Sequence, residues 1–349
     1  MFIRNAWYAG AWGHELTKTN MLSRKLLGET LLFYRIDNGT ITALRDRCSH
    51  RFAPLSIGRR EGDCVRCMYH GLVFNPEGKC VEEPGRKGVS PNTDVRSYPA
   101  VERDRLVWVW MGDPALADPN RIPDCSVQTD PSWACDPRYI HYDADYRLIL
   151  DNLLDFSHLT FVHENTLGGS RQIAETRPKV EQTDLGVRLT RWYLNEPHVA
   201  PYLDGFATFD GPVDRWHIYH LSTLGNVFVM DSGSAPANSG APQGTRVPEA
   251  MQFVATQIAT PEDERNTHFF WSYAHNFRID DTAFTQMLSD RILQGFEEDK
   301  YFIEQQQTRI DESGDAGMAF ILADNGLALG RRLIEAKIAE ESANPTTAA

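Results

Sequence analysis

Residues 62–71 read GDCVRCMYHG and bring cysteine and histidine close together in the chain. A similar pair precedes this stretch, so that the sequence offers Cys48-x-His50 and then Cys67-x-x-His70. Each segment supplies one sulfur and one nitrogen, and thiolates and imidazoles are common ligands of transition metals. The two segments together predict a metal site with four protein ligands.

The order of these ligands bears on which metal they hold. A zinc finger normally presents both cysteines before both histidines, and a zinc ribbon using Cys64-x-x-Cys67 would need a second Cys-x-x-Cys that this chain lacks. Interleaved pairs suit a [2Fe–2S] cluster in which one iron takes both thiolates and the other takes both imidazoles. We favour the cluster over zinc, and expect Cys64 to be a small buried residue beside the loop.

The residues around this site indicate short strands separated by turns. The segments TLLFYRIDNGTITAL (30–44) and HGLVFNPEGKCVE (70–82) each join two apolar runs through a turn sequence. The proline-rich segment GDPALADPNRIPD (112–124) then marks the end of this region. We predict one all-β domain over residues 1–125 and a second domain over residues 126–349.

The second domain mixes helices and strands. Leucines in residues 144–159 form a helical stripe, and helical patterns return over 281–310 and 325–341. Between them, runs rich in β-branched and aromatic residues predict an antiparallel sheet. The segment 231–244 is rich in Gly, Ser and Pro and indicates a loop, and whether residues 232–244 gate a site stays open. The predicted fold class is α+β, in which an all-β domain precedes an antiparallel sheet flanked by helices in a helix-grip-like arrangement.

Composition excludes several functional classes. The 349 residues carry a formal net charge of −13, which argues against a protein that neutralises the phosphates of nucleic acid or of an anionic membrane. No apolar run approaches the roughly 18 residues that span a bilayer, and the N-terminus lacks the pattern of a signal peptide. Six cysteines are too few for a disulfide scaffold. We expect a cytoplasmic protein.

A second group of metal-binding side chains lies in DNLLDFSHLTFVHENT, residues 151–166. On a continuous helix, Asp151, Asp155 and His158 share one face, whereas His158 and His163 lie about 140° apart. The helix must therefore end or loosen between the two histidines. A lone histidine on such a face is usually a core residue, but two histidines with carboxylates favour a metal, as in the facial triad of non-haem iron oxygenases.

The carboxylate of such a triad is expected on another element. Residues 282–307 carry an apolar stripe at helical spacing, and Asp299 falls on that stripe, where an unpaired charge is costly to bury. We predict Asp299 as the third ligand beside His158 and His163. Glu297 and Glu298 turn away from the stripe and are predicted to be solvated.

These motifs resemble those of the Rieske non-haem iron aromatic-ring-hydroxylating oxygenases. CSHRFAPLS and CMYHGLVFNPEGKC are similar to the two signature loops of the Rieske domain, and Asn-x-x-Asp-x-x-His-x4-His, with an aspartate far downstream, is similar to the catalytic domain. NAWYAGAW, VERDRLVWVWMGDPALADP and DNGLALGRRLIE resemble the branch that contains vanillate and dicamba O-demethylases and toluenesulfonate methyl-monooxygenases. The last of these is most similar, on RWYLN, DRWHIY and GSAPANSGAPQG.

The resemblance implies a role for each matching residue. It assigns Cys48 and Cys67 to one iron of the cluster and His50 and His70 to the other, and it assigns a mononuclear Fe(II) to His158, His163 and Asp299. Asn152 and Asp155 match catalytic-domain positions. Asp155 would carry electrons from His70 of a neighbouring subunit to His158, which implies a homotrimer; the alternative is a helix-surface charge.

The implied reaction is monooxygenation of an aromatic compound at a methyl group on carbon or oxygen. The substrate is expected to be an aromatic acid such as a toluenesulfonate or methoxybenzoate, with non-acid aromatics as the alternative. Candidate contacts are Gln257, His217 and Trp271, with Arg191, Arg215 and His220 as further donors to an anion. Phe269, Trp271 and Tyr273 share one strand face, which is core more often than pocket.

Electrons must come from a partner, because the chain shows no glycine-rich dinucleotide fingerprint. The resemblance implies an NADH-dependent reductase that carries flavin and a plant-type iron–sulfur cluster. Two rival hypotheses stay open: a Rieske electron carrier that performs no catalysis, and a zinc-stabilised scaffold protein.

Overall fold

The computed structural model describes residues 1–168, 170–203, 205–207, 209–314 and 317–343. The chain divides into two compact units. The first comprises Met1–Ile122 with Thr260–Glu264 and the described residues 340–343, and the second comprises Pro123–Ala259 and Arg265–Ala339. Within the described residues, no helix has the length and apolar character needed to cross a bilayer.

The first unit consists of short strands. They are β1 (Trp7–Trp12), β2 (Met21–Leu26), β3 (Glu29–Arg35), β4 (Ile41–Arg45), β5 (Arg59–Glu61), β6 (Cys64–Arg66), β7 (Val73–Phe74), β8 (Cys80–Glu82), β9 (Ser97–Tyr98), β10 (Ala100–Arg103) and β11 (Leu106–Trp110), with 3-10 turns η1 (Gly13–Glu15), η2 (Pro114–Leu116) and η3 (Pro119–Arg121). The strands form three antiparallel sheets in the orders β1-β11-β10, β2-β3-β4-β9 and β5-β6-β7-β8. Both predicted hairpins are confirmed, as β3–β4 and β7–β8.

The core of this unit reaches the cysteine-bearing loops. Leu32, Leu44 and Phe74 are fully buried and cluster with Cys48 and Cys67, which are themselves buried. Burying this apolar surface holds the loops that follow β4 and β6 against the sheets. Cys64 is half-buried at the start of β6, which is less burial than the sequence predicted.

The second unit is α+β. Its strands are β12 (Arg138–Tyr142), β13 (Lys179–Gln182), β14 (Gly186–Glu196), β15 (Val213–Ser222), β16 (Val227–Pro236), β17 (Met251–Pro261) and β18 (Thr267–His275). Its helices are α1 (Tyr146–Leu154), α2 (Leu159–Val162), α3 (Arg171–Glu175), α4 (Thr282–Ser313) and α5 (Asn325–Ala343), with 3-10 turns η4 (Ser126–Gln128), η5 (Phe156–His158), η6 (Pro201–Leu203), η7 (Ala241–Gln243) and η8 (Leu322–Asp324). The predicted fold class is confirmed.

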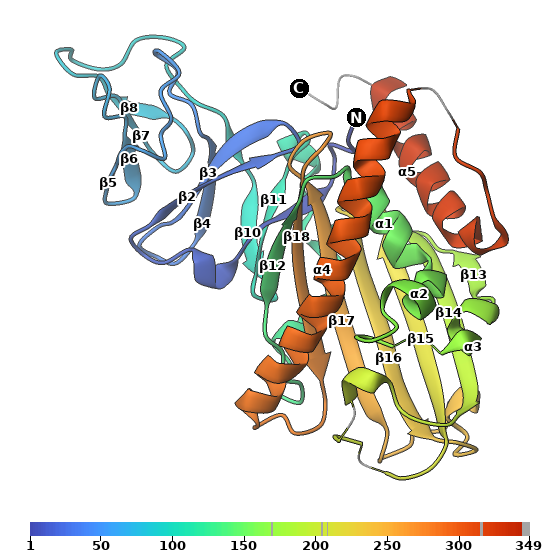
Figure 1. The fold of residues 1–349 in the computed structure, drawn as a ribbon. Coiled ribbons are helices and arrows are strands. Elements are labelled where there is room, and N and C mark those ends of the chain that lie inside the picture. The colour runs from blue at the N-terminus through green and yellow to red at the C-terminus, as the bar shows by residue number, and fades with distance from the viewer. Residues whose placement is uncertain (169, 204, 208, 315–316, 344–349) are drawn as a thin grey trace. The chain divides into compact units, whose positions relative to one another are not determined.

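The strands of this unit form one antiparallel sheet in the order β12-β18-β17-β16-β15-β14-β13, and α1, α2 and α4 lie on one face of it (Figure 1). The sequence prediction of a loop over 231–244 is wrong for residues 231–236. These belong to β16, because each pairs with a residue of β15, as in Asp231 with Ile218 and Pro236 with Val213. Only the turn beyond Pro236 is irregular, and its gating role stays a prediction.

The helix that carries the predicted metal ligands is interrupted earlier than expected. Asp155 ends α1 in an extended conformation, with φ −120° and ψ 101°, and its carboxylate caps η5 by accepting a hydrogen bond from the Ser157 backbone. The prediction that Asp151, Asp155 and His158 share one helical face is therefore wrong. The chain turns at Asp155, and this turn brings His158 and His163 to the same place.

Candidate metal centres and substrate pocket

The two cysteine-bearing loops of the first unit repeat one backbone pattern. The Cys48 N–H donates to the Ala53 carbonyl, and the Cys67 N–H donates to the Leu72 carbonyl. In each loop the residue four positions after the cysteine, Phe52 or Gly71, donates back to the cysteine carbonyl and has a positive φ. The two loops therefore share one turn geometry, and each presents one cysteine and one histidine.

The ligand atoms of these loops fit a [2Fe–2S] cluster. The rings of His50 and His70 lie 4.4 Å apart between centroids and are exposed, whereas Cys48 and Cys67 are buried. Burial, together with the neighbouring Cys67 thiol, raises the pKa of Cys48 to about 11. A bound iron would stabilise the thiolate form that this environment disfavours.

The second unit brings three predicted ligands together. The Nε2 atoms of His158 and His163 lie 3.4 Å and 3.1 Å from Oδ1 of Asp299, and the three ligand atoms fall within 4.8 Å of one another. His163 is fully buried, and among the described residues its Nε2 has no hydrogen-bond partner, although Asp299 is close. An unsatisfied buried nitrogen beside a carboxylate and a second imidazole is what a two-histidine, one-carboxylate iron site requires.

Both histidines are held through their other nitrogen. Nδ1 of His158 lies 2.5 Å from the Asp155 carbonyl oxygen, and Nδ1 of His163 lies 2.7 Å from Oε2 of Glu298. Glu298 also accepts a hydrogen bond from the Thr166 hydroxyl at 2.6 Å. The prediction that Glu298 is merely solvated is wrong, because it reaches back to His163; Glu297 is exposed as predicted. Such partners fix the tautomer and the orientation of ligand histidines.

The residues of the triad shift the pKa of Asp299 and the pKa of His163 in opposite directions. Burial raises the pKa of Asp299, but the close imidazoles of His158 and His163 outweigh it and lower the pKa to about 2. Burial lowers the pKa of His163, but Asp299 and Glu298 outweigh it and raise that pKa. Asp299 is therefore ionised at neutral pH and available to a cation.

Two further predicted residues have distinct positions. Asn152 donates from Nδ2 to Oδ1 of Asp299 at 3.0 Å and lies 3.4 Å from Nε2 of His158, so it contacts the triad directly. Asp151 turns away from the triad and forms a two-armed ion pair with Arg331 of α5. It is a structural residue that links α1 to α5.

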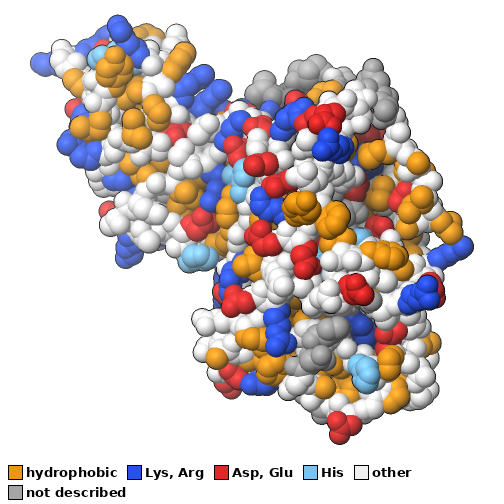
Figure 2. All heavy atoms as spheres, viewed as in Figure 1, with side chains coloured by type: hydrophobic (Ala, Val, Ile, Leu, Met, Phe, Trp, Pro, Cys, Tyr) orange, Lys and Arg blue, Asp and Glu red, His pale blue; other side chains and the backbone are white. Residues whose placement is uncertain are grey.

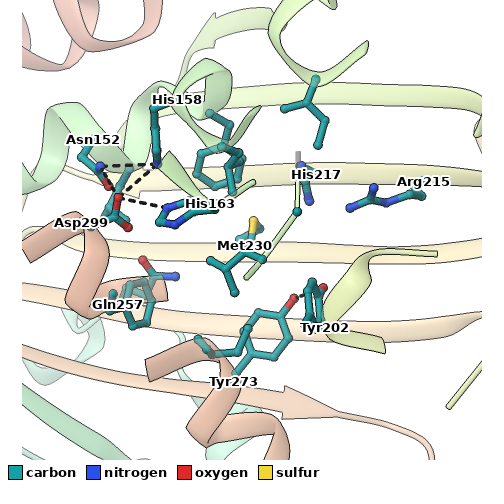
Figure 3. A pocket seen from close by; sticks show the side chains of 18 residues that line it. Asn152, His158, His163, Tyr202, Arg215, His217, Met230, Gln257, Tyr273 and Asp299 are labelled. Atoms are coloured by element: carbon teal, nitrogen blue, oxygen red, sulfur yellow. Dashed lines mark hydrogen bonds and ion pairs between the residues drawn. The ribbon is translucent and has the colours of Figure 1, made fainter. Parts of the chain in front are cut away.

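A pocket opens at the triad (Figure 3). It is lined by Asn152, Leu153, Phe156, His158, Leu159, His163, Leu167, Gly168, Ile173, Tyr202, Arg215, His217, Met230, Gln257, Tyr273, Ile292, Phe296 and Asp299. The part of the cavity that the centres of water molecules can occupy has a volume of about 70 Å³. That volume holds roughly five waters, or about 150 Å³ of liquid, which matches one substituted benzene ring.

Two of the three predicted substrate contacts line the pocket, and one does not. His217 and Gln257 line the pocket, as does Arg215, whereas Trp271 is not among the lining residues. The Trp271 ring is fully buried and packs edge-on against Phe296, at 4.9 Å between centroids. Sequence reasoning missed Met230 and Tyr202, which come from separate elements and carry no motif.

Comparisons with known proteins identify the family. A model of the vanillate O-demethylase oxygenase C-terminal domain matches residues 142–340, and a model of the Rieske [2Fe-2S] domain matches residues 6–99. The iron-sulfur subunit of the toluene-4-sulfonate monooxygenase system of Comamonas testosteroni is 48% identical over 345 residues, which cover 98% of this chain and 99% of that protein. The dicamba O-demethylase oxygenase component of Stenotrophomonas maltophilia is 37% identical over 323 residues, 87% of each chain.

Solved structures agree. The crystal structure of dicamba monooxygenase bound to 3,6-dichlorosalicylic acid superposes with a TM-score of 0.90 at 33% identity, covering 98% of this chain and 99% of that one. Dicamba monooxygenase with non-heme iron and dicamba superposes with a TM-score of 0.83 at 33% identity, again over 98% and 99%. The resemblance inferred from the motifs is confirmed. The chain belongs to the Rieske non-haem iron oxygenases, a family of oxidoreductases, in the branch of the vanillate and dicamba O-demethylases.

Proposed function

We propose that this chain is the terminal oxygenase component of a monooxygenase that hydroxylates a methyl group of an aromatic acid. The observation that carries the proposal is the position of His158, His163 and Asp299 at a pocket the size of one aromatic ring. The relatives named above support the substrate class, because toluene-4-sulfonate and dicamba are both aromatic acids.

Two iron centres would serve this reaction. Cys48, His50, Cys67 and His70 would hold the [2Fe–2S] cluster, and His158, His163 and Asp299 would hold the mononuclear iron. Bound there, the iron would supply the activation of O2. The overall reaction balances as one methyl group, O2, two electrons and two protons giving one hydroxymethyl group and one water.

The protein contributes positioning and exclusion of water. Leu167, Ile292 and Phe296 give the pocket apolar walls, so an aromatic ring displaces water when it enters. Asn152 holds Asp299 through its amide. If the hydroxylated methyl is carried on oxygen, the hemiacetal collapses to a phenol and formaldehyde; if it is carried on carbon, a benzylic alcohol remains.

Electrons would arrive from NADH through a separate reductase with flavin and a plant-type iron–sulfur cluster. Apolar side chains close to the cluster ligands support a docking role: Phe52, Met68 and Tyr69 are 63%, 55% and 62% exposed. Figure 2 shows hydrophobic side chains beside a histidine at the end of the unit that carries β5 to β8. We infer a homotrimer in which Asp155 passes electrons from a neighbour's cluster. We also infer a cytoplasmic location, where NADH is available.

A coupled assay tests this function. Purified chain, NADH and a flavin-dependent reductase are incubated with methyl- and methoxy-substituted aromatic acids, and formaldehyde and hydroxylated products are scored separately. We expect hydroxylated product or formaldehyde in proportion to NADH consumed, and loss of both in His158→Ala, which retains the visible spectrum of the cluster. NADH-dependent reduction of the cluster without any product, equal in wild type and His158→Ala, would instead identify an electron carrier.

A further inference from the structure

Arg215 is a buried cation without a counter-charge in the described part of the chain. It lies on β15, is 5% exposed and lines the pocket. Among the described residues, no carboxylate oxygen lies within 4.0 Å of its guanidinium, although the same radius finds partners for most arginines of this chain. A buried charge is costly unless it is paired. A bound anion is the missing partner that this position calls for.

Two tyrosines line the same pocket as Arg215. They are Tyr202 and Tyr273, and their hydroxyls lie 3.0 Å apart. Burial raises the pKa of each phenol, although the positive charge of Arg215 opposes that rise, so both hydroxyls stay protonated. Protonated hydroxyls are hydrogen-bond donors that suit an anion.

His217 is the next pocket residue on the same face of β15. It is buried, and burial, followed by the charges of Arg215 and Arg191, lowers its pKa well below the usual value. The imidazole is therefore neutral, and one of its nitrogens is a donor while the other is an acceptor. Which nitrogen carries the hydrogen depends on the partner of Nδ1.

Tyr193 decides the tautomer of His217. Its hydroxyl lies 3.2 Å from Nδ1 of His217, and it is fully buried. Burial raises the pKa of Tyr193, and the adjacent Arg191 guanidinium opposes the rise. A cation on one side of the phenol attracts its oxygen, so the hydroxyl hydrogen points to the other side and donates to Nδ1. The hydrogen of the imidazole then resides on Nε2, which has no partner among the described residues.

We propose that Arg215 and the Nε2–H of His217 bind the anionic group of the substrate, a sulfonate or a carboxylate, and that Tyr193 is the positioning residue that holds His217 as a donor. Figure 3 shows Arg215 and His217 across the pocket from His158 and Asp299, with Met230 between them. The aromatic ring then spans the pocket between its anchored anion and the metal ligands. This inference rests on the proposed function and names the group by which that site selects its substrate.

Anaerobic binding tests the subsite without turnover. Isothermal calorimetry on the iron-loaded protein uses 4-methylbenzenesulfonate and 4-methylbenzoate as the two anions, and 4-methylbenzenesulfonamide as a neutral analogue of the same shape. Arg215→Met should weaken both anions by at least about 30-fold, as expected for a lost charge-assisted pair, and change the sulfonamide by less than about 3-fold. The anion that binds wild type more tightly identifies the headgroup. Arg188→Met, an exposed arginine on β14, is the matched control and should bind all three as wild type does.

The positioning role of Tyr193 needs a separate readout. Tyr193→Phe should raise the KM for the anionic substrate by about 5- to 10-fold, the value of one hydrogen bond between neutral groups, with kcat unchanged and sulfonamide binding unaffected. His217→Gln, whose amide nitrogen reaches the place of Nε2, should retain anion binding better than His217→Asn. Equal loss of anion and sulfonamide binding in Arg215→Met, or equal KM and kcat effects in Tyr193→Phe, would overturn the proposal. Tight anaerobic binding of an anion without any oxidation would leave the subsite standing and refute the oxygenase function instead.

Discussion

Three neighbouring acidic residues on α4 have different environments. Asp299 is 4% exposed and faces His158 and His163, whereas Glu297 is exposed to solvent. Glu298 lies between these extremes and reaches Nδ1 of His163. A one-residue step along a helix rotates a side chain by about 100°, so neighbouring carboxylates can serve the metal, its ligand and the solvent in turn.

Removal of the Glu298 carboxylate should weaken the mononuclear iron site. Glu298→Ala leaves Nδ1 of His163 without its acceptor, so the ring loses its fixed orientation. We expect iron affinity at this site to fall about 10- to 100-fold, the usual cost of losing such a partner. Iron analysis after dialysis against a chelator measures it, while the visible spectrum of the cluster reports that the first unit is intact.

Glu297→Ala is the matched control, since it removes an exposed carboxylate from the adjacent position. Its iron content should equal that of wild type, and Glu298→Gln should lie between wild type and Glu298→Ala because an amide oxygen can still accept from Nδ1. Identical iron retention in Glu298→Ala and wild type would show that Glu298 has no part in the site.

The candidate ligands could be predicted from the sequence because each breaks a local pattern. Asp299 interrupts an apolar helical stripe, and His158 and His163 stand among leucines. Glu298 follows no such rule, because its partner lies 135 positions away on another segment. Trp271 and Tyr273 share one strand face. Phe296 packs on Trp271, so of these two residues only Tyr273 lines the pocket.

At the scale of elements, the sequence predicts which segments are helical better than where they end. The helix expected over 281–310 is α4 (Thr282–Ser313), and Asp281 caps its first turn through the Phe284 N–H. Helical periodicity does not predict the break at Asp155. The Asp155 carboxylate accepts a hydrogen bond from the Ser157 N–H, and this local bond competes with continuation of the helix. Likewise, β16 extends through Pro236 because β15 offers it a full set of partners.

The pair of Asp151 and Arg331 joins α1 to α5 and should make stability depend on pH. Burial raises the pKa of Asp151, and the Arg331 guanidinium opposes the rise. In Arg331→Met the carboxylate stays buried without its partner, so its pKa rises further above the unfolded value. The variant should unfold more easily by about 3 kcal/mol at pH 7.

The sign of the pH dependence follows from the raised pKa. Protonated Asp151 carries no charge to bury, so the deficit of Arg331→Met should be largest at neutral pH and should shrink as the pH falls toward 4.5. Thermal unfolding midpoints of wild type and variant at both pH values measure the change. Asp151→Asn combined with Arg331→Met should recover most of the loss at pH 7; a deficit that is equal at both pH values would contradict the argument.

At the scale of the whole molecule, the two candidate metal centres belong to different compact units. The cluster ligands lie on two loops of an all-β unit, and the mononuclear ligands lie on α4 and on the segment between α1 and α3. The motifs alone predict both sets of ligands, because each set is nearly contiguous in sequence apart from Asp299. The proposed electron path between the centres uses a residue outside the sequence motifs of the cluster.

The proposed residue is Asp155, whose backbone carbonyl and side-chain carboxylate have separate contacts. Its backbone carbonyl accepts from Nδ1 of His158, and its side-chain carboxylate accepts from the backbone N–H and hydroxyl of Ser157. Asp155→Asn therefore keeps the contact to His158 and an oxygen for the Ser157 N–H, while the negative charge is lost. We expect both iron centres and anaerobic substrate binding to be retained, but reoxidation of the reduced cluster and product formation to slow by about 100-fold or more.

Stopped-flow absorbance of the cluster in the presence of substrate and O2 measures the rate of cluster reoxidation. Glu164→Gln, which neutralises an exposed carboxylate on the same segment, should react as wild type does. Cluster reoxidation at the wild-type rate in Asp155→Asn would remove Asp155 from the electron path and leave it as the cap of η5.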